Sequence, residues 1–594
     1  MNNINTDTEK QNKKPRNYRR ILSGLMNYLL KEWKMLTVSL TLVVLANLLA
    51  LWGPRLSGEA IDAISGGQGN VDFTTTIYKT LLMLGVYLGS VVLTYIMTRV
   101  MVRVSQRVIV NMRQDTFDKI VELPLSYIDT HQAGDLVSRI SYDLDVVNQS
   151  LTHDLIQILA SLITVVGSLV MMFSISVELS MVFLLLVPAT VIFTAYRVKK
   201  TRPLFSRRSR KLGELNGYVE EILFGQKTIQ AYGKEEYFSE EFSERNQVSI
   251  DAYYRADYQG SFNGPSIALI TNLSLALVTM FGALLFLQGK LVSIGFLASF
   301  TLYSRRFSGP INQIAGIVAE LQSALSAANR VFNLLDQPSE PADKPDAHVL
   351  TDVKGEVDFV NVSFSYVPGI PIIQDFSLKV PPGSLTAIVG PTGAGKTTLI
   401  NLLMRFYDPQ EGEIRIDGHS SLDVTRKSLR QSFAMVLQDT WLFKGTIREN
   451  IAYGRPETSL EDIKRVAKAA HISEFIEAQP DEYDTIIDDD ASNLSQGQKQ
   501  LLTIARAMLI DAPMLILDEA TSNVDSQTEI LIQDAMNKLI EGRTSFVIAH
   551  RLSTIQDADN ILLIMDGRVK EQGTHEELLE EDGAYAQLYR AQFS

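Results

Sequence analysis

A glycine-rich loop between an apolar run and a helix-like run is the strongest chemical signal in this sequence. The apolar run Leu385–Val389 precedes the loop, and the run Thr398–Phe406 follows it. Glycines let the backbone turn so that successive N–H groups point at phosphate oxygens, and the helix N-terminus adds its dipole. Lys396 is expected to neutralise charge on the β and γ phosphates of a nucleoside triphosphate, and Thr397 to place its hydroxyl on Mg²⁺. The predicted loop residues are Gly390, Pro391, Thr392, Gly393, Ala394, Gly395, Lys396, Thr397 and Thr398.

Two carboxylates at the end of a second apolar strand supply chemistry that matches this loop. The run Met514–Leu517 is apolar and is followed by Asp518 and Glu519. At a strand end, Asp518 can hold magnesium through water. Glu519 is placed to polarise an attacking water. Because many strands end in an acid, the pair indicates hydrolysis only in combination with the glycine-rich loop.

With these two elements, the sequence resembles the ATP-binding-cassette (ABC) superfamily over essentially the whole chain. Leu494–Gln498, which reads LSQGQ, resembles the family's signature loop LSGGQ and lies about 20 residues before the second apolar strand, as it does in the family. Ser522–Asp525 resembles the D-loop. Together with the single-residue matches given next, these motifs follow the family order, which makes a chance match negligible.

The resemblance implies a role for each motif residue. The signature loop closes over ATP bound to an opposite domain, an aromatic residue stacks on adenine, a Q-loop glutamine contacts Mg²⁺ and senses the membrane domain, and a switch histidine contacts the γ phosphate. The corresponding residues are Ser495, Gln496, Gly497 and Gln498 for the signature, Tyr366 for the aromatic, Gln438 for the Q-loop and His550 for the switch. Thr397, Gln438 and Asp518 are then the predicted Mg²⁺ contacts, and Glu519 and His550 the predicted catalytic residues.

The first half of the chain contains six apolar stretches of the length needed to cross a membrane as helices. They are Met35–Pro54, Thr80–Thr98, Leu155–Val177, Leu179–Tyr196, Tyr258–Gln288 and Leu291–Ala319. Glu178 alone separates the third from the fourth, which predicts a tight hairpin. Charges occur only in the last stretch, at Arg305 and Arg306. A charge at that depth is costly and favours a water-filled cavity, the alternative being a position near the membrane interface.

The loop charges predict the orientation of these spans. Ser57–Thr75 carries acidic residues but no Lys or Arg, whereas the long segments after the second and fourth spans are rich in both. The N-terminus, the long segments and the nucleotide-binding domain are therefore expected in the cytoplasm, with the spans in a bacterial plasma membrane. The segment Tyr127–Leu136 resembles a first coupling helix and Phe224–Lys227 a second one, although both also fit simple turns at Gly134 and Gly225.

These features predict an all-α six-helix transmembrane domain followed by an α/β P-loop nucleotide-binding domain, the architecture of ABC exporters. The expected parts are residues 1–34 as a cytoplasmic tail with an amphipathic elbow helix, 35–335 as the transmembrane domain, 336–350 as a linker with Pro338, Pro341 and Pro345, and 351–594 as the nucleotide-binding domain. The net charge of −13 excludes a typical nucleic-acid binder, and the absence of cysteine among 594 residues excludes disulfides and thiol chemistry.

The altered signature bears on assembly. Gln496 replaces a glycine whose backbone lies near the partner's phosphate, where a side chain needs room. The chain then offers one intact half-site and one altered half-site, which resembles one half of the heterodimeric bacterial multidrug exporters. We expect an ATP-hydrolysing exporter of amphipathic compounds, drugs or lipids, whose partner has an intact LSGGQ and a degenerate catalytic glutamate. The alternatives are a homodimeric lipid or peptide exporter and a nucleotide-gated channel or regulator.

Overall fold

The computed structural model describes residues 18–65, 71–289, 293–438, 440–488, 491, 493–518, 525–548 and 555–593. The chain divides into two compact units. One, here called the helical unit, comprises Met1–Glu122 and Gln132–Gln337. The other, the sheet unit, comprises Leu123–His131 and Pro338–Ser594. The short insertion Leu123–His131 thus belongs to the sheet unit, although it lies in the first third of the sequence.

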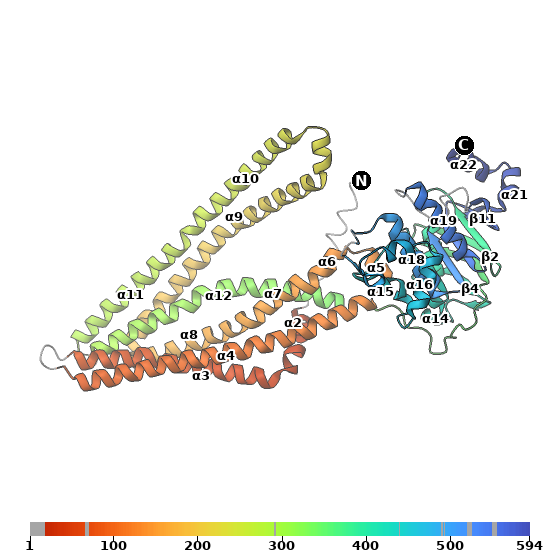
Figure 1. Cartoon of the computed structure of the whole chain (residues 1–594). Helices are drawn as coiled ribbons and strands as arrows, with labels where there is room; N and C mark the ends of the chain where they lie inside the picture. Colours follow the sequence, from red (N-terminus) through yellow and green to blue (C-terminus); the bar gives the residue numbers. More distant parts are fainter. Residues whose placement is uncertain are drawn as a thin grey trace. The chain divides into compact units, whose positions relative to one another are not determined.

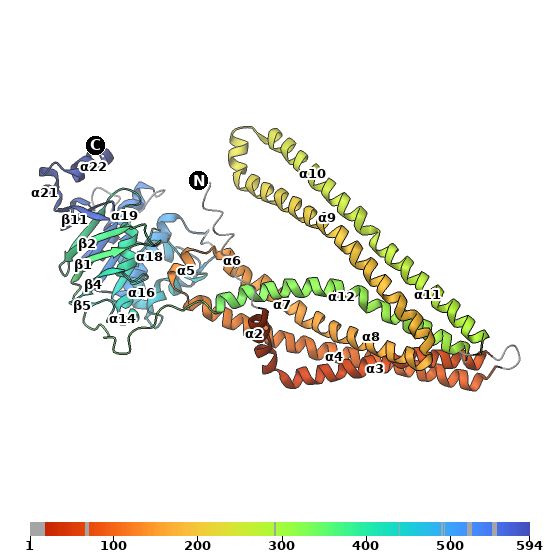
Figure 2. The same ribbon diagram turned by 180° about the vertical axis from the view of Figure 1, so that it is seen from behind.

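Long helices build the helical unit (Figure 1). The longest, α9, has 55 residues, which at about 1.5 Å per residue is roughly 80 Å and exceeds any bilayer core. It runs beside α10 and α11, as the view from behind also shows (Figure 2). The elements are α2 (Tyr18–Lys31), α3 (Trp33–Ile64), α4 (Phe73–Glu122), α6 (Ala133–Ser138), η1 (Arg139–Asp143), α7 (Leu144–Gln149), η2 (Ser150–Asp154), α8 (Leu155–Ile175), α9 (Val177–Ala231), α10 (Glu235–Ser261), α11 (Asn263–Leu287) and α12 (Ile294–Leu335).

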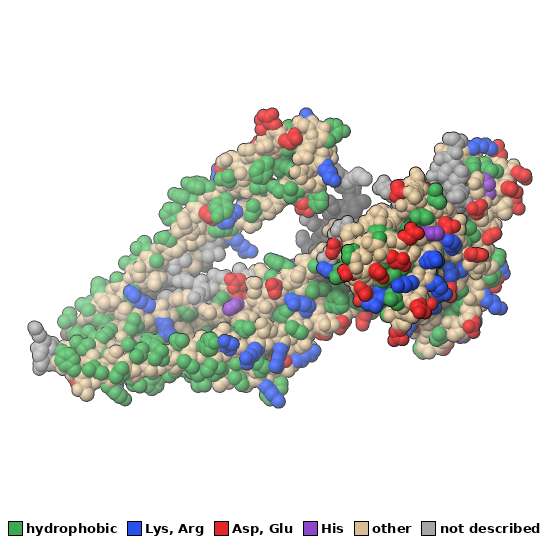
Figure 3. All heavy atoms as spheres, viewed as in Figure 1, with side chains coloured by type: hydrophobic (Ala, Val, Ile, Leu, Met, Phe, Trp, Pro, Cys, Tyr) green, Lys and Arg blue, Asp and Glu red, His purple; other side chains and the backbone are tan. Residues whose placement is uncertain are grey.

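Apolar side chains cover the outside of this unit. Leu81, Leu88 and Val91 of α4 are each more than half exposed, and hydrophobic side chains gather along α3 and α4 in Figure 3. A continuous apolar exterior of this size requires a lipid environment. Among the described residues, four helical stretches are long and apolar enough to cross a membrane: Trp33–Ile64, Phe73–Glu122, Ala133–Ile175 and Glu235–Leu287. The fourth and sixth predicted spans fall in α9 and α12, which are not among these four stretches. The predicted count of six spans therefore stays a prediction.

Two predicted breaks lie elsewhere than expected. Ser176, not Glu178, separates α8 from α9: its backbone is extended, with φ −156°, and its Oγ accepts a hydrogen bond from the Leu179 N–H at 3.2 Å as the helix cap. Glu178 lies inside the first turn of α9, where a carboxylate complements the helix dipole. The expected break at Gly225 is also wrong, because α9 continues to Ala231 and the turn follows at Gly233, whose φ is +58°.

Hydrogen bonds join α3 to α12 beside a proline. Pro54 lies within α3 and has no N–H, so the carbonyl of Ala50, four residues earlier, loses its helical donor. Arg306 donates to this oxygen from Nη1 at 2.8 Å. Tyr303 donates from its hydroxyl to the Leu51 carbonyl at 2.6 Å, and Ser299 donates to the Pro54 carbonyl at 2.9 Å. Arg306 is half-buried and its neighbour Arg305 is exposed, so Arg306 supplies the donor that Pro54 removes. The water-filled cavity and the position near the membrane interface both stay predictions for this pair.

The sheet unit is an α/β domain. A six-stranded sheet in the order β12-β11-β3-β10-β9-β6 has five parallel strands, with β12 antiparallel at one edge. A separate antiparallel sheet has the order β2-β1-β4-β5, and β7 pairs with β8. The strands are β1 (Val357–Phe364), β2 (Ile373–Val380), β3 (Leu385–Val389), β4 (Glu411–Ile416), β5 (His419–Ser420), β6 (Phe433–Val436), β7 (Gly445–Thr446), β8 (Ile486–Ile487), β9 (Met514–Asp518), β10 (Thr544–Ile548), β11 (Asn560–Met565) and β12 (Arg568–Gly573).

Two hydrophobic cores hold these layers. One fills the space between the antiparallel sheet and one face of the parallel strands, and the other lies under the helices on the opposite face. The strands β9 and β10 are buried along nearly their whole length, as parallel strands covered on both faces must be. The helices are α5 (Leu125–Asp129), α13 (Lys396–Leu403), α14 (Arg426–Gln431), α15 (Ile447–Ile451), α16 (Leu460–Ala469), α17 (Ser473–Glu477), α18 (Gln496–Ile510), α19 (Ser526–Ile540), α21 (His575–Glu580) and α22 (Ala584–Phe593).

Candidate functional site

The predicted chemical residues share one edge of the parallel sheet. Strands β3, β10, β9 and β6 are neighbours that run in the same direction. The register pairs Ile548 of β10 with both Ile388 of β3 and Asp518 of β9. The glycine-rich loop follows β3 directly, Asp518 ends β9, and Gln438 comes two residues after β6. In parallel sheets, ligands bind at this carboxyl edge.

The glycine-rich loop adopts a backbone that requires glycine at several points. Gly390 has φ +154° and Gly395 has φ +104°. A Cβ on Gly390 would lie 2.3 Å from the Ile564 carbonyl oxygen, and one on Gly395 would lie 2.7 Å from the Ile373 Cδ1 atom. Gly393, with φ +85°, has open space around it. The loop therefore has a fixed path whose exposed face, with Pro391, Thr392 and Gly393, is bare of bulky side chains.

Lys396 is held against this loop at the start of α13. Its Nζ donates hydrogen bonds to the carbonyl oxygens of Gly390 at 2.7 Å and Pro391 at 3.1 Å. Burial lowers the pKa of the Lys396 ammonium, while the negative charge of Asp518 opposes that shift. A half-buried cation whose other contacts are neutral carbonyls is well placed to bind an anion, and the N-terminus of α13 adds a positive dipole at the same place.

The two threonines after Lys396 differ in environment. Thr397 is exposed, as a residue that binds a metal from solvent must be, whereas Thr398 is buried. The Thr398 Oγ1 accepts a hydrogen bond from the Tyr366 hydroxyl at 3.3 Å, and Asn401 Nδ2 donates to the same hydroxyl at 3.2 Å. The ring of Tyr366 is thereby fixed beside the glycine-rich loop, with 44% of its surface exposed.

Tyr407 and Asp129 extend this aromatic cluster, and the sequence analysis did not find either residue. The ring of Tyr407 packs edge-on against Tyr366 at 5.0 Å and against Phe364 at 5.5 Å. Its hydroxyl donates to Asp129 Oδ2 at 2.6 Å. Asp129 ends α5, within the segment Tyr127–Leu136 that resembles a coupling helix. Burial and this carboxylate together raise the pKa of the Tyr407 phenol.

The signature segment begins helix α18 with reciprocal capping. Ser495 Oγ accepts the N–H of Gln498 at 3.3 Å, and Gln498 Oε1 accepts the N–H of Ser495 at 2.9 Å. Gly497 is buried beneath them. The side chain of Gln496 turns toward its own chain, where its Nε2 donates to Thr440 Oγ1 at 3.3 Å. Thr440 lies two residues after the predicted Q-loop residue Gln438, which is exposed in a bend.

Some predicted residues lie outside the described parts of the chain. These are Glu519, His550 and, in the segment resembling a D-loop, Ser522 to Val524. Asp525, the last residue of that segment, is described and caps α19 by accepting the Thr528 N–H at 2.9 Å. This backbone hydrogen bond lowers the pKa of Asp525.

The donor set suits a magnesium ion bound together with phosphates. Thr397, Gln438 and Asp518 provide hydroxyl, amide and carboxylate oxygens, which Mg²⁺ prefers. Within the described residues no group of three or more His, Cys, Asp or Glu side chains could hold a metal ion. A nucleotide-bound Mg²⁺, which takes few protein ligands, fits this composition better than a metal held by protein alone.

Comparisons with known proteins agree over nearly the full length. A family profile described as the ABC transporter transmembrane region matches residues 36–311, and one described as ABC transporter matches residues 373–522. The chain is 44% identical over 536 residues to a fatty acid ABC transporter ATP-binding/permease protein of Mycobacterium bovis, covering 89% of this chain and 84% of the relative.

Two further matches cover almost all of both proteins. An ATP-dependent lipid A-core flippase of Chromobacterium violaceum is 35% identical, with 97% of each chain aligned. The solved structure of a bacterial Atm1-family ABC exporter with ATP bound is 31% identical, with a TM-score of 0.77, covering 94% of this chain and 98% of that one. The predicted order of a helical transmembrane domain followed by an α/β P-loop domain is thereby confirmed.

Proposed function

Since the chain belongs to the ABC transporter family and is a half-transporter that couples ATP hydrolysis to transport, we propose that it exports lipids or other acyl-chain amphiphiles across a membrane. The names of two relatives, a fatty acid transporter and a lipid A-core flippase, support this substrate class. Export of amphipathic drugs is a wider version of the same chemistry, because cavities for drugs and lipids use similar apolar walls.

The observation that supports the ATPase site is the position of Lys396, whose Nζ donates to the Gly390 carbonyl of the glycine-rich loop. The negative charge of Asp518 acts on the pKa of the same ammonium group. Lys396 and the backbone N–H groups of Gly393 to Thr398 bind the phosphates of ATP. Thr397, Gln438 and Asp518 would hold Mg²⁺, and a bound Mg²⁺ would supply charge neutralisation at the phosphates. Tyr366 stacks on the adenine. Glu519 accepts a proton from the attacking water, and His550 contacts the γ phosphate.

The test of transport uses inside-out membrane vesicles from cells that make the protein, so that any second half-transporter is present with the chain. Two probes are offered with Mg²⁺ and ATP outside: a fluorescent fatty acid and a phospholipid with a fluorescent headgroup. We expect ATP-dependent movement of at least one lipid probe, and its loss in Lys396→Ala. Movement of ethidium alone, with both lipid probes unmoved, would contradict the lipid assignment and would support a drug exporter.

For the assembly, we propose a heterodimer with a second, different half-transporter. In the family, each ATP site combines one chain's phosphate loop with the other chain's signature, and Gln496 makes this chain's signature the altered part. The partner would supply an intact LSGGQ and would lack the catalytic glutamate. One site would hydrolyse ATP, and the other would mainly hold nucleotide.

A specific observation favours the second candidate, a homodimer. The Gln496 amide donates to Thr440 of its own chain at 3.3 Å, which turns the side chain toward the Q-loop region. A side chain held in this way leaves the backbone at Gln496 available to a facing phosphate. Activity of the chain purified alone distinguishes the two assemblies, and neither outcome changes the assignment as a transporter.

We further propose that both termini are cytoplasmic and that the protein lies in a bacterial plasma membrane. The charge difference between the loops supports this orientation. Helix α2 supports it as well. Leu22, Met26 and Leu30, spaced four residues apart, are each about half exposed, whereas Ile21 and Leu29 are buried. A helix with an unpaired apolar face between basic residues suits the inner membrane surface.

A further inference from the structure

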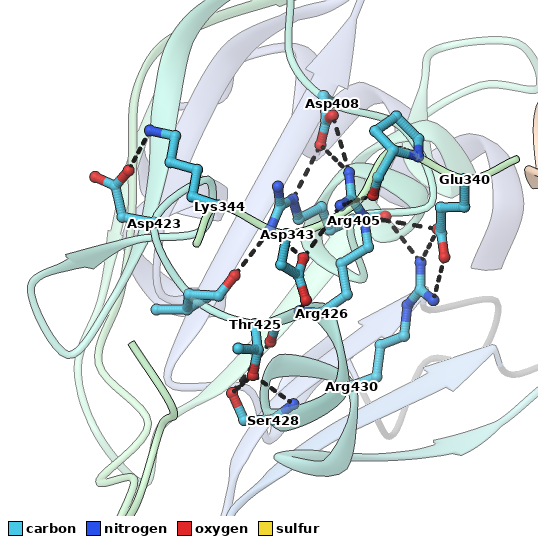
Figure 4. Close-up of polar contacts among 12 residues, drawn as sticks. Glu340, Asp343, Lys344, Arg405, Asp408, Asp423, Thr425, Arg426, Ser428 and Arg430 are labelled. Carbon is cyan, nitrogen blue, oxygen red and sulfur yellow. Dashed lines mark hydrogen bonds and ion pairs between the residues drawn. The ribbon is translucent and has the colours of Figure 1, made fainter. Parts of the chain in front are cut away.

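The chain that enters the sheet unit is fastened there by ionic contacts (Figure 4). Glu340 and Asp343 precede β1, and Asp408 follows α13. Together with Arg405, Arg426 and Arg430 they form the set of six residues that we call the clamp. Arg430 contacts Glu340 through both terminal nitrogens, at 3.1 and 2.5 Å. Arg426 donates its backbone N–H to Asp343 at 3.0 Å and a guanidinium N–H to the Pro341 carbonyl at 2.6 Å.

Two arginines of the clamp also connect it to elements of the ATP site. Arg430 donates to the carbonyls of Met404 at 3.3 Å and Arg405 at 3.0 Å, where α13 ends and carbonyls lack helical partners. Helix α13 begins with Lys396 of the glycine-rich loop. Arg426 begins α14, which leads through Ser432 into β6 and then to Gln438. The linker thus contacts the far end of the phosphate-binding helix and the segment before the Q-loop.

Two arginines of the clamp are buried, while its carboxylates are partly exposed. Arg405 is 5% exposed and Arg426 is 7% exposed. Arg405 donates to Asp408 at 3.0 Å and to the Val424 carbonyl at 2.9 Å. The carboxylate balances its charge, and the two hydrogen bonds fix the orientation of its guanidinium. An ion pair made by a buried arginine adds little net stability, because desolvation offsets the attraction, but removing its carboxylate leaves the buried charge uncompensated. The clamp therefore fixes the path of the linker more than it stabilises the domain.

On the other side of the linker, the chain is held by the helical unit. Asp336 pairs with Arg20, and its N–H donates to the Phe332 carbonyl at 3.0 Å. The N–H of Gln337 donates to the Leu334 carbonyl at 3.1 Å. Only Pro338 and Ser339 separate Gln337 from the clamp residue Glu340. Even fully extended, this connection spans about 11 Å between the two flanking Cα atoms, so it can absorb little displacement.

We propose that the clamp residues are positioning residues for the ATPase cycle, which transmit displacement between the end of α12 and the two elements that carry Lys396 and Gln438. A linker anchored this closely acts as a short strap. Nucleotide binding at α13 then restrains the last turns of α12 through the covalent chain, in addition to any contact made by the coupling segments.

The test is hydrogen–deuterium exchange on the full chain, with and without Mg²⁺ and the analogue AMP-PNP. In the wild type, nucleotide should slow exchange in α13 and also in residues 325–337. In the double variant Glu340→Gln, Asp343→Asn, nucleotide should still slow exchange in α13. The slowing at residues 325–337 should be at least about fivefold smaller than in the wild type, a typical coupling magnitude. Lys344→Gln is the matched control. Lys344 lies in the same linker and forms an exposed ion pair with Asp423 outside the clamp, so this variant should behave as wild type.

A second variant keeps the clamp intact. Insertion of Gly-Ser between Pro338 and Ser339 lengthens the connection without touching any clamp contact, and it should abolish the effect at 325–337 in the same way. The proposal is overturned if the wild type shows no effect there, or if the insertion or the double variant retains it. It is also overturned if the double variant loses the α13 effect in parallel, since the clamp would then only support the local structure.

Discussion

Arg306 donates a hydrogen bond to the carbonyl of Ala50 at 2.8 Å, the oxygen that Pro54 leaves without its helical donor. A charge in an apolar span is expensive, and an unpaired carbonyl in the same place is expensive too. The contact offsets both costs at once, because the Arg306 cation gains an oxygen acceptor and the Ala50 carbonyl regains a donor.

This relationship predicts that Arg306 and Pro54 are energetically coupled. Arg306→Met should lower the free energy of unfolding by about 1–3 kcal/mol by stranding the Ala50 carbonyl. In a Pro54→Ala background the backbone N–H restored at this position can bond that carbonyl, so the same substitution should cost less by about 1 kcal/mol. Thermal unfolding of the four proteins in detergent measures the coupling. Arg305→Met, at the exposed neighbour, is the control, and equal costs in both backgrounds would contradict the assignment.

Glu519→Gln should separate binding from hydrolysis. The substitution keeps the shape of the side chain and removes the base, so ATP should still bind while turnover falls at least about 100-fold. Filter binding of labelled ATP and steady-state phosphate release measure the two properties. Turnover within about threefold of the wild type would remove Glu519 from the catalytic role, since a positioned base contributes far more than that.

Tyr407→Phe should loosen the segment Leu123–His131. The change removes the hydroxyl that donates to Asp129 and keeps the ring against Tyr366. Hydrogen exchange in residues 123–131 should accelerate about tenfold, the effect of losing roughly 1.5 kcal/mol from a hydrogen bond to a charged acceptor. Exchange in α13 should not change. Unchanged protection of 123–131 would show that the bond does not hold this segment.

The same bond has a defined pH dependence. Because burial and Asp129 raise the pKa of the Tyr407 phenol above its usual range, the folded state binds this proton more tightly than the unfolded state. The stabilisation is therefore fully present below the ordinary tyrosine pKa of about 10 and is lost only as the pH rises through the folded value. Between about pH 6 and 9 the difference in unfolding free energy between wild type and Tyr407→Phe should stay constant. A difference that shrinks in this range would contradict the protonation state.

Two substitutions, one at Gln496 of the signature and one at its acceptor Thr440, discriminate between the assemblies. If Gln496 obstructs a homodimer, the isolated chain should hydrolyse ATP slowly, and Gln496→Gly should accelerate it. If Thr440 keeps the glutamine clear, the isolated chain should be active and Thr440→Val should slow it, because the amide loses its acceptor. Phosphate release in liposomes measures both variants. An active wild type that Thr440→Val leaves unchanged would contradict the role given to this hydrogen bond.

The ATP site could be located from sequence because its motifs follow strands. Leu385–Val389 and Met514–Asp518 are continuous apolar runs, which is how strands of a buried parallel sheet read, and the structure has strands with these bounds. Parallel neighbours present their carboxyl ends at one edge, so the loop and Asp518 had to meet. The hydrogen bond between Tyr407 and Asp129 had no such pattern. It joins residues 278 positions apart, and no sequence motif indicates that the two residues are in contact.

The misplaced breaks have local physical causes. Gly225 costs a helix only about 1 kcal/mol relative to alanine, and the helix-forming residues around it outweigh that cost. The charge of Glu178 is the more conspicuous signal in the sequence, but serine is a preferred helix cap and glutamate belongs in the first turn, so the break lies at Ser176. The cost of Arg306 in lipid is visible in the sequence, whereas the carbonyl of Ala50 that it contacts becomes visible only when α3 and α12 are packed together.

The contacts between α3 and α12 also affect how the two helices can diverge among relatives. All three donors beside Pro54 are side chains of α12, and all three acceptors are main-chain oxygens of α3. Every residue type carries such an oxygen, so a change of side chain at position 50 or 51 leaves the acceptor in place. Two polar side chains that contact each other tend to be substituted together among relatives. These three hydrogen bonds have a main-chain acceptor, so they produce no such correlation. Statistical coupling between aligned sequences should therefore understate this helix pair, even where its hydrogen bonds are retained in every member.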